Sequence, residues 1–198
     1  MISRWAVVAG ALGSAGLAVA VAGAPLSAFV SESGVPGAPH AGLYAASMVL
    51  LALSLALLTP AQPLRAAAAC FGLAAPLAGV AAGVHCSPGC PLPPYETPSA
   101  RDLVHATGAV GALGLCALAM LLCATLPAAG RFWRRAGRIG ILVAYPPLIL
   151  SAAGILLVGR SLFTGVTERL ALAAVCAWVV FSSAAVPRTS APPAPGSR

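Results

Sequence analysis

The stretch that decides the fold is residues 103–126, LVHATGAVGALGLCALAMLLCATL, which contains no charged side chain. Its apolar residues follow one another continuously instead of alternating with polar ones, so the pattern is typical of a membrane helix and not of a barrel strand. The hydrocarbon layer of a bilayer is about 30 Å thick, a distance that about 20 helical residues span. Residues 103–126 therefore predict a transmembrane helix.

Five more apolar runs of similar length lie on either side of this one, at residues 5–24, 41–58, 66–84, 139–158 and 170–186. The whole sequence is 60% hydrophobic and 8% charged, with a mean hydropathy of +0.95, which excludes a water-soluble globular protein. We therefore predict an all-α, polytopic membrane protein built as a six-transmembrane-helix bundle. Residues 1–186 are expected to form a single domain, and the Pro/Ser/Ala-rich residues 187–198 a disordered cytoplasmic tail.

The first run also has features of a secretory signal peptide. Arg4 precedes it, and Ala22-Gly23-Ala24 resembles a small-residue cleavage site. The run is longer than a typical signal sequence, however, and Pro25 would directly follow the cut, where proline is a poor fit. We therefore expect this run to remain as the first helix.

The sequence contains no lysine, so all the positive charges in its formal net charge of +7 come from arginine. Such a composition, rich also in Ala, Gly and Pro, is typical of a GC-rich bacterial genome. The arginines are spread among the connections between apolar runs, so nucleic acid is not a predicted partner. When a membrane protein is inserted, its arginine-rich connections usually stay in the cytoplasm. The distribution of the arginines therefore predicts how the chain is oriented in the cell membrane.

A cytoplasmic N-terminus places eight arginines inside and three outside, which predicts an N-in/C-in topology. The inner set is Arg4, Arg65, Arg131, Arg134, Arg135, Arg138, Arg188 and Arg198, and the outer set is Arg101, Arg160 and Arg169. The same orientation puts every acidic residue and every histidine on the outer side.

The connection after the third run contains Cys86 and Cys90 on that outer side, where an oxidising compartment lets a disulfide persist. Pro88-Gly89 between them is a turn-forming pair, which favours bringing the two sulfur atoms together. Two free thiols are the alternative. The other four cysteines lie inside apolar runs and are expected to be small core residues.

A Cys-x-x-Gly-Cys-Pro sequence after the third of six runs, followed by Asp-x-x-His at the start of the fourth, resembles a known family. It is similar to the bacterial and archaeal membrane-protein family catalogued as domain of unknown function number 998. The resemblance implies a six-helix integral membrane protein, covers roughly residues 5–186 and assigns no activity. The matching positions are Cys86, Gly89, Cys90, Pro91, Asp102 and His105.

Five side chains form a candidate outer polar cluster, namely His40, His85, Glu96, Asp102 and His105. Histidines from neighbouring helices, with the carboxylates, would suit a zinc or copper ion, a haem edge or a quinone headgroup if they converged. No spacing here is diagnostic of such a site, so no metal, cofactor or catalytic residue is predicted. Asp102 also has a structural explanation, because Ser99 and Asp102 have the spacing of a capping box.

The candidate inner lipid-facing basic loop comprises Arg131, Arg134, Arg135 and Arg138. Arginines beside an anionic leaflet attract lipid headgroups, so membrane lipids are the predicted partners, and the sequence identifies no protein partner. The sequence favours a binding or structural component with a disulfide-capped polar cluster over an enzyme. The alternatives are a membrane-embedded metal- or haem-dependent redox enzyme that uses the outer-leaflet histidines, and a transporter of a neutral or lipidic substrate.

Overall fold

The computed structural model describes residues 2–184, and the described residues contain no β-strand. The long helices are α1 (Ile2–Ala22), α2 (Ala41–Leu58), α3 (Arg65–Gly83), α4 (Ala100–Thr125), α5 (Gly130–Leu157) and α6 (Leu162–Ala184). Three short 3-10 helices lie in the connections, η1 (Val30–Gly34), η2 (Thr59–Ala61) and η3 (Pro127–Ala129). The predicted all-α fold with six helices is confirmed, while the predicted tail 187–198 lies outside the described residues.

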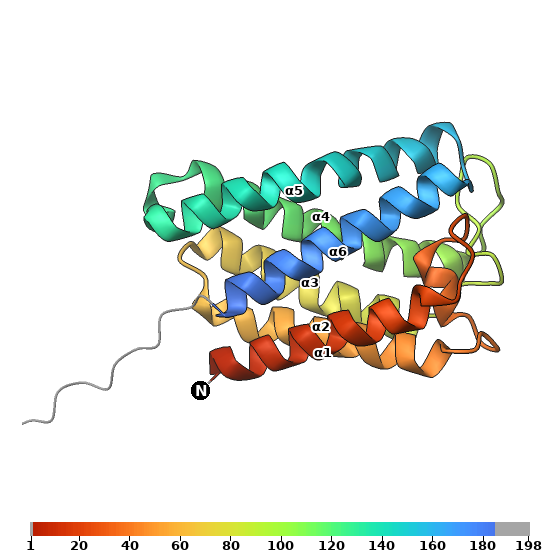
Figure 1. The fold of residues 1–198 in the computed structure, drawn as a ribbon, viewed down its shortest axis with the longest axis horizontal. Coiled ribbons are helices and arrows are strands. Elements are labelled where there is room, and N and C mark those ends of the chain that lie inside the picture. The colour runs from red at the N-terminus through yellow and green to blue at the C-terminus, as the bar shows by residue number, and fades with distance from the viewer. Residues whose placement is uncertain (1, 185–198) are drawn as a thin grey trace, which may run out of the picture.

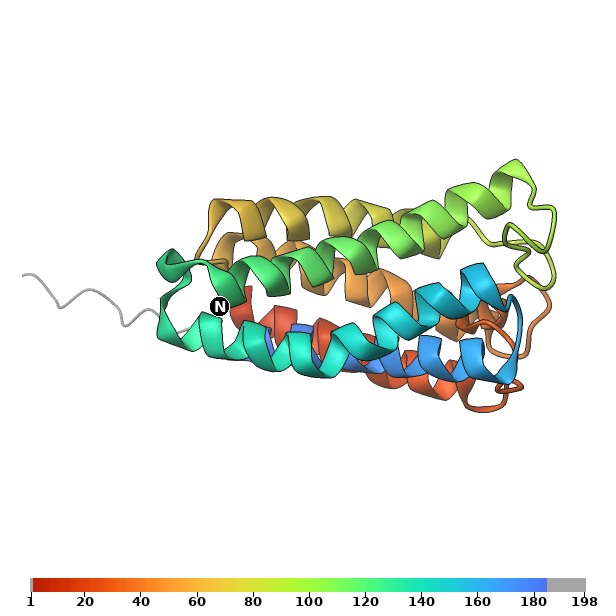
Figure 2. The same ribbon diagram turned by 90° about the horizontal axis from the view of Figure 1, so that it is seen from above.

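All six helices are long and apolar enough to cross a membrane, as expected of a multi-pass membrane protein. Each helix packs against its neighbours in the chain, and α6 returns to pack against α1, so the bundle closes into a ring (Figures 1 and 2). Helices α2 and α3 form a hairpin, with η2 in its short connection. The ring leaves an interior toward which all six helices turn one face.

The two ends of the bundle differ in the connections that they carry (Figure 1). We call one the cap end, because the long connections 23–40 and 84–99 and the short connection 158–161 meet there. The other is the arginine-rich end, which carries connections 59–64 and 126–129, the start of α1 and the end of α6. Every histidine and acidic residue of the sequence therefore lies in the half of the bundle next to the cap end.

Large side chains fill the interior in the half next to the arginine-rich end. The Phe71 and Trp178 rings stack with their centroids 5.8 Å apart, and Trp178 Nε1–H donates to the Ala136 carbonyl at 3.1 Å. Met120 beside them is fully buried. A side chain on Gly137 would meet the backbone of α4, so α4 and α5 approach closely there.

Helices α5 and α6 begin earlier than the apolar runs predict, at Gly130 and Leu162 rather than at residues 139 and 170. The arginines that the sequence places in an inner loop lie instead in the first turns of α5, so that part of the prediction is wrong. Arginine is a good helix former, and Trp133, Ala136 and Gly140 turn inward at helical spacing. Counting apolar residues misses such an amphipathic turn.

Candidate functional site

A cavity of about 130 Å³ lies inside the ring, beneath the cap end. All six long helices contribute to its wall, and most of the wall is aliphatic or aromatic. Much of the cavity exists because α4 has small residues there. Ala106, Ala109 and Ala112 line the cavity, and larger side chains at these positions would fill it. An apolar interior with a few polar groups at one end is the usual form of a small-molecule site.

The cavity is closed at the cap end by two connections that pack on each other. Phe29, in the connection between α1 and α2, is buried against Cys86 and Cys90, and all three line the cavity. Cys86 and Cys90 form the predicted disulfide. The Cys90 N–H donates to the Ser87 carbonyl at 2.8 Å, and Gly89 has the left-handed φ of 85° that the third position of a Pro-Gly turn requires.

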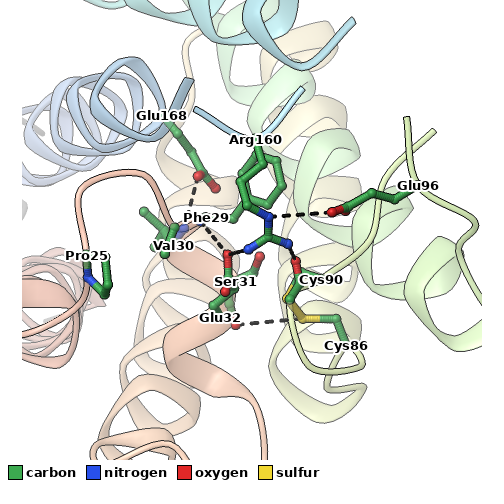
Figure 3. Close-up of polar contacts among 12 residues, drawn as sticks. Pro25, Phe29, Val30, Ser31, Glu32, Cys86, Cys90, Glu96, Arg160 and Glu168 are labelled. Carbon is green, nitrogen blue, oxygen red and sulfur yellow. Dashed lines mark hydrogen bonds and ion pairs between the residues drawn. A yellow bond between two sulfur atoms is a disulfide. The ribbon is translucent and has the colours of Figure 1, made fainter. Parts of the chain in front are cut away.

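Arg160, between α5 and α6, joins these two connections (Figure 3). Its guanidinium pairs with Glu32 of η1 and donates to the Gly89 carbonyl of the disulfide connection. Its Nε lies 3.5 Å from a carboxylate oxygen of Glu96, and its Cζ lies 5.3 Å from the centroid of the Phe29 ring. We call residues 25–35, 86–96 and Arg160 together the lid.

Asp102, at the start of α4, attaches the disulfide connection to the bundle. It is 2% exposed, and its carboxylate accepts from the backbone N–H groups of Ser87 at 2.6 Å and Ser99 at 2.8 Å. Both serine hydroxyls also lie within hydrogen-bond distance of it. The predicted capping box of Ser99 and Asp102 is therefore present, and Asp102 additionally holds the turn that contains the disulfide.

His105 lies one turn further into α4 and is 4% exposed. Its Nδ1 lies 2.6 Å from the Val84 carbonyl oxygen at the end of α3. Because a carbonyl oxygen can only accept, Nδ1 carries the hydrogen, and whenever the ring has a single hydrogen Nε2 is an acceptor. That Nε2 is buried without a partner among the described residues, and His105 lines the cavity.

Two more polar side chains reach the cavity from other helices. Glu168 of α6 lines it and accepts from the Val30 N–H at 2.9 Å, which ties η1 to α6 (Figure 3). Tyr44 of α2 also lines it and is 4% exposed, with its ring against Gly34. Three helices thus bring His105, Glu168 and Tyr44 to one apolar cavity.

The structure brings together only part of the predicted outer polar cluster. Asp102 and His105 line the cavity, Glu96 belongs to the lid, and the predicted disulfide forms part of the cavity wall. His40 is exposed before α2, and neither it nor His85 lines the cavity. Within residues 2–184, no three His, Cys, Asp or Glu side chains converge as a metal site would require.

Sequence reasoning did not single out Glu32, Tyr44 or Glu168, and it used Arg160 only in the arginine count for orientation. The small number of charged residues was the available signal for these positions. The chain has only four acidic residues, and all of them are predicted on the outer side. Arg160 is one of only three arginines on the expected outer side, where arginine is unusual. No local pattern indicated Tyr44, whose position facing the cavity depends on the packing of α2.

The sequence profile of a family described as "Protein of unknown function (DUF998)" matches residues 5–185. No curated protein and no solved structure matched the chain. The match covers all six helices, the lid and the cavity.

Proposed function

Since the chain belongs to the DUF998 family, which is described only as a protein of unknown function, we propose its function from its own geometry. It is a multi-pass membrane protein that binds a small, mainly apolar molecule in the cavity beneath the lid. The ligand carries at least one hydrogen-bond donor.

The unpartnered Nε2 of buried His105 is the observation that carries this proposal. Leaving a buried acceptor without a hydrogen bond costs about 1–3 kcal/mol. A ligand that donates to Nε2 recovers this loss, and the aliphatic wall supplies apolar contact for the rest of the molecule. A purely structural role gives no reason to bury an acceptor without a partner beside a cavity.

The size of the cavity limits the ligand. An apolar cavity of about 150 Å³ is large enough to bind benzene, and this one measures about 130 Å³. A molecule with one six-membered ring and one polar substituent is therefore a suitable probe. Benzyl alcohol has a donor, and toluene has nearly the same shape without one.

The test is calorimetric titration of the purified full chain in detergent, with empty micelles as the blank. We expect saturable binding of benzyl alcohol and weaker binding of toluene. His105→Phe should remove the difference between the two probes, and Ala109→Leu should abolish binding by filling the cavity. Ala152→Leu, an equal enlargement at an exposed position of α5, is the matched control. Equal binding by Ala109→Leu and the unmodified chain would place the ligand elsewhere and refute the proposal.

We further propose that the cap end faces outward in the cell membrane, with both termini in the cytoplasm. The arginine count supports this, because most arginines lie at the opposite end of the bundle. An impermeant maleimide should label Cys86 and Cys90 in intact cells only after reduction. The doubly substituted C86S/C90S chain is the control. Labelling of the unmodified chain without reductant would contradict the proposed disulfide in an oxidising compartment.

We also propose that membrane lipids bind at the first turns of α5. Arg131, Arg134, Arg135 and Arg138 make no ion pair among the described residues, and no acidic residue lies at their end. Each can contribute about 1 kcal/mol of attraction to an anionic leaflet. Exchanging all four for glutamine should lower the amount of phosphatidylglycerol that copurifies with the protein. The cap end has fewer than four arginines, so an exchange of four arginines cannot be matched there. The single exchange Arg101→Gln serves as the control.

A further inference from the structure

We propose that the ligand of the cavity is a small organic cation, an amine with an apolar body of about one ring. This inference rests on the proposed function, since it names the chemical class that the same cavity takes. It follows from the distribution of charge around the cavity.

The four acidic residues of the sequence divide into two pairs. Glu32 and Glu96 belong to the lid, and Arg160 pairs with both of them. Asp102 and Glu168 form no ion pair within residues 2–184, and both line the cavity. The two acidic residues without a cationic partner are thus those that line the cavity.

The two arginines nearest to the cavity, Arg160 and Arg169, bind other groups. Arg169 follows Glu168 directly, but its guanidinium donates to the carbonyls of Pro25 at 3.0 Å and Ala28 at 2.8 Å in the lid. It also donates to the Gly165 carbonyl of its own helix at 2.9 Å. Arg160 lies on the lid and pairs there. No arginine side chain lines the cavity among the described residues.

Glu168 and Asp102 differ in how well their charge is satisfied. Asp102 accepts from two backbone N–H groups and two hydroxyls, so its hydrogen bonds to Ser87 and Ser99 are complete. The only hydrogen bond of the Glu168 carboxylate in the described part of the chain comes from the Val30 N–H. A carboxylate in apolar surroundings stays ionised only with a cation or several donors beside it, and otherwise takes up a proton. Glu168 is therefore the counter-ion that the cavity offers.

The other polar groups suit the same ligand. An ammonium group has three donors and no acceptor, and His105 Nε2 is an acceptor with no partner. Tyr44, which also lines the cavity, is an aromatic residue of the kind to which organic cations bind. A neutral alcohol would satisfy Nε2 and leave Glu168 without a counter-charge. An anion would meet two carboxylates.

Benzylamine and benzyl alcohol test this inference, because they have the same body and the amine is protonated at neutral pH. We expect the unmodified full chain in detergent to bind benzylamine about tenfold more tightly than benzyl alcohol, as a charge-assisted hydrogen bond allows. Glu168→Gln, which keeps the size and one oxygen acceptor, should remove that preference. Arg101→Gln removes an exposed charge at the same end that neither lines the cavity nor belongs to the lid, and it should leave the preference unchanged.

The outcomes separate this inference from the proposed function. If benzyl alcohol binds as tightly as benzylamine, the ligand is not selected by charge, and this inference fails while the proposed function stands. If neither probe binds, both fail. If the preference for benzylamine persists in a Glu168→Gln chain that unfolds at the same temperature as the unmodified one, Glu168 is not the counter-ion. Should that variant not fold, the ratio measured on the unmodified chain decides by itself.

Discussion

The same six helices are packed solid in one half of the bundle and hollow in the other. Next to the arginine-rich end, Phe71, Trp178 and Met120 fill the interior. Next to the cap end, alanines of α4 face a cavity of about 130 Å³. Helices α4 and α5 lie close together at the arginine-rich end and diverge toward the cap end (Figure 2).

This difference in packing indicates that the half next to the cap end contributes less to the stability of the fold. In soluble cores, an unfilled cavity costs about 24 cal/mol per Å³, so about 130 Å³ corresponds to about 3 kcal/mol of lost packing. The cap half also holds the unpartnered His105 Nε2 and the unpaired Glu168. We infer that the arginine-rich half carries the stability of the fold and that the cap half is specialised for binding.

Among variants that test this division of stability, Trp178→Ala in the packed half should have the largest effect. It removes the stack on Phe71 and the hydrogen bond to the Ala136 carbonyl, and it should lower the free energy of unfolding by about 3–5 kcal/mol. Thermal unfolding in detergent measures the loss. Trp5→Ala is the control, because Trp5 is 62% exposed and should cost little. Similar losses for the two variants would show that the packed half has no special role.

Gly137→Ala should have the next largest effect. Its added methyl carbon would lie 2.6 Å from the Ala124 nitrogen and 2.7 Å from the Met120 carbonyl oxygen, so α4 and α5 would have to move apart. Overpacking of this kind costs about 1–3 kcal/mol. Gly114→Ala on α4 meets nothing within 4 Å and should be neutral or slightly stabilising. Equal unfolding temperatures for these two alanine variants would contradict the close approach.

The sequence was sufficient to predict the helices, because the length and continuity of an apolar run can be counted without knowing its neighbours. The same holds for the Pro88-Gly89 turn between the two cysteines and for the capping box of Ser99 and Asp102. Each is a local relation within a few residues. The early start of α5 was missed because its first turns are amphipathic and fall below a hydropathy threshold.

The cavity could not be predicted, because it is a property of packing among six helices. The sequence placed His105 in the candidate polar cluster, but it did not show that Nδ1 lies against the Val84 carbonyl oxygen or that Nε2 is buried without a partner among the described residues. The ion pair of Arg160 with Glu32 joins two connections that lie 128 residues apart in the sequence. Such contacts depend on which helix ends meet, and the order of apolar runs does not specify that.

In the cap half, Asp102→Ala should cost about 1–2 kcal/mol, less than the losses expected in the packed half. It removes the cap of α4 and leaves the Ser87 N–H without its acceptor. Asp102→Asn keeps one acceptor oxygen and should lose less. Thermal unfolding separates the two variants, and hydrogen exchange should show faster exchange at residues 86–96 in both. A loss for Asp102→Ala larger than that for Trp178→Ala would reverse the proposed division of stability.

The smallest effect on stability is expected for Arg160→Gln. Its ion pairs lie partly in solvent, with 31% of the Arg160 side chain exposed, and such pairs contribute about 0–1 kcal/mol each. The unfolding temperature should therefore change little, while amide exchange accelerates in residues 25–35 and 86–96 because these two connections lose a shared partner. Arg101→Gln, an exposed arginine at the same end, should alter neither measurement. If exchange in the lid is unchanged in Arg160→Gln, the disulfide connection and η1 hold each other without the guanidinium, and closure of the cavity then rests on the packing of Phe29 against Cys86 and Cys90.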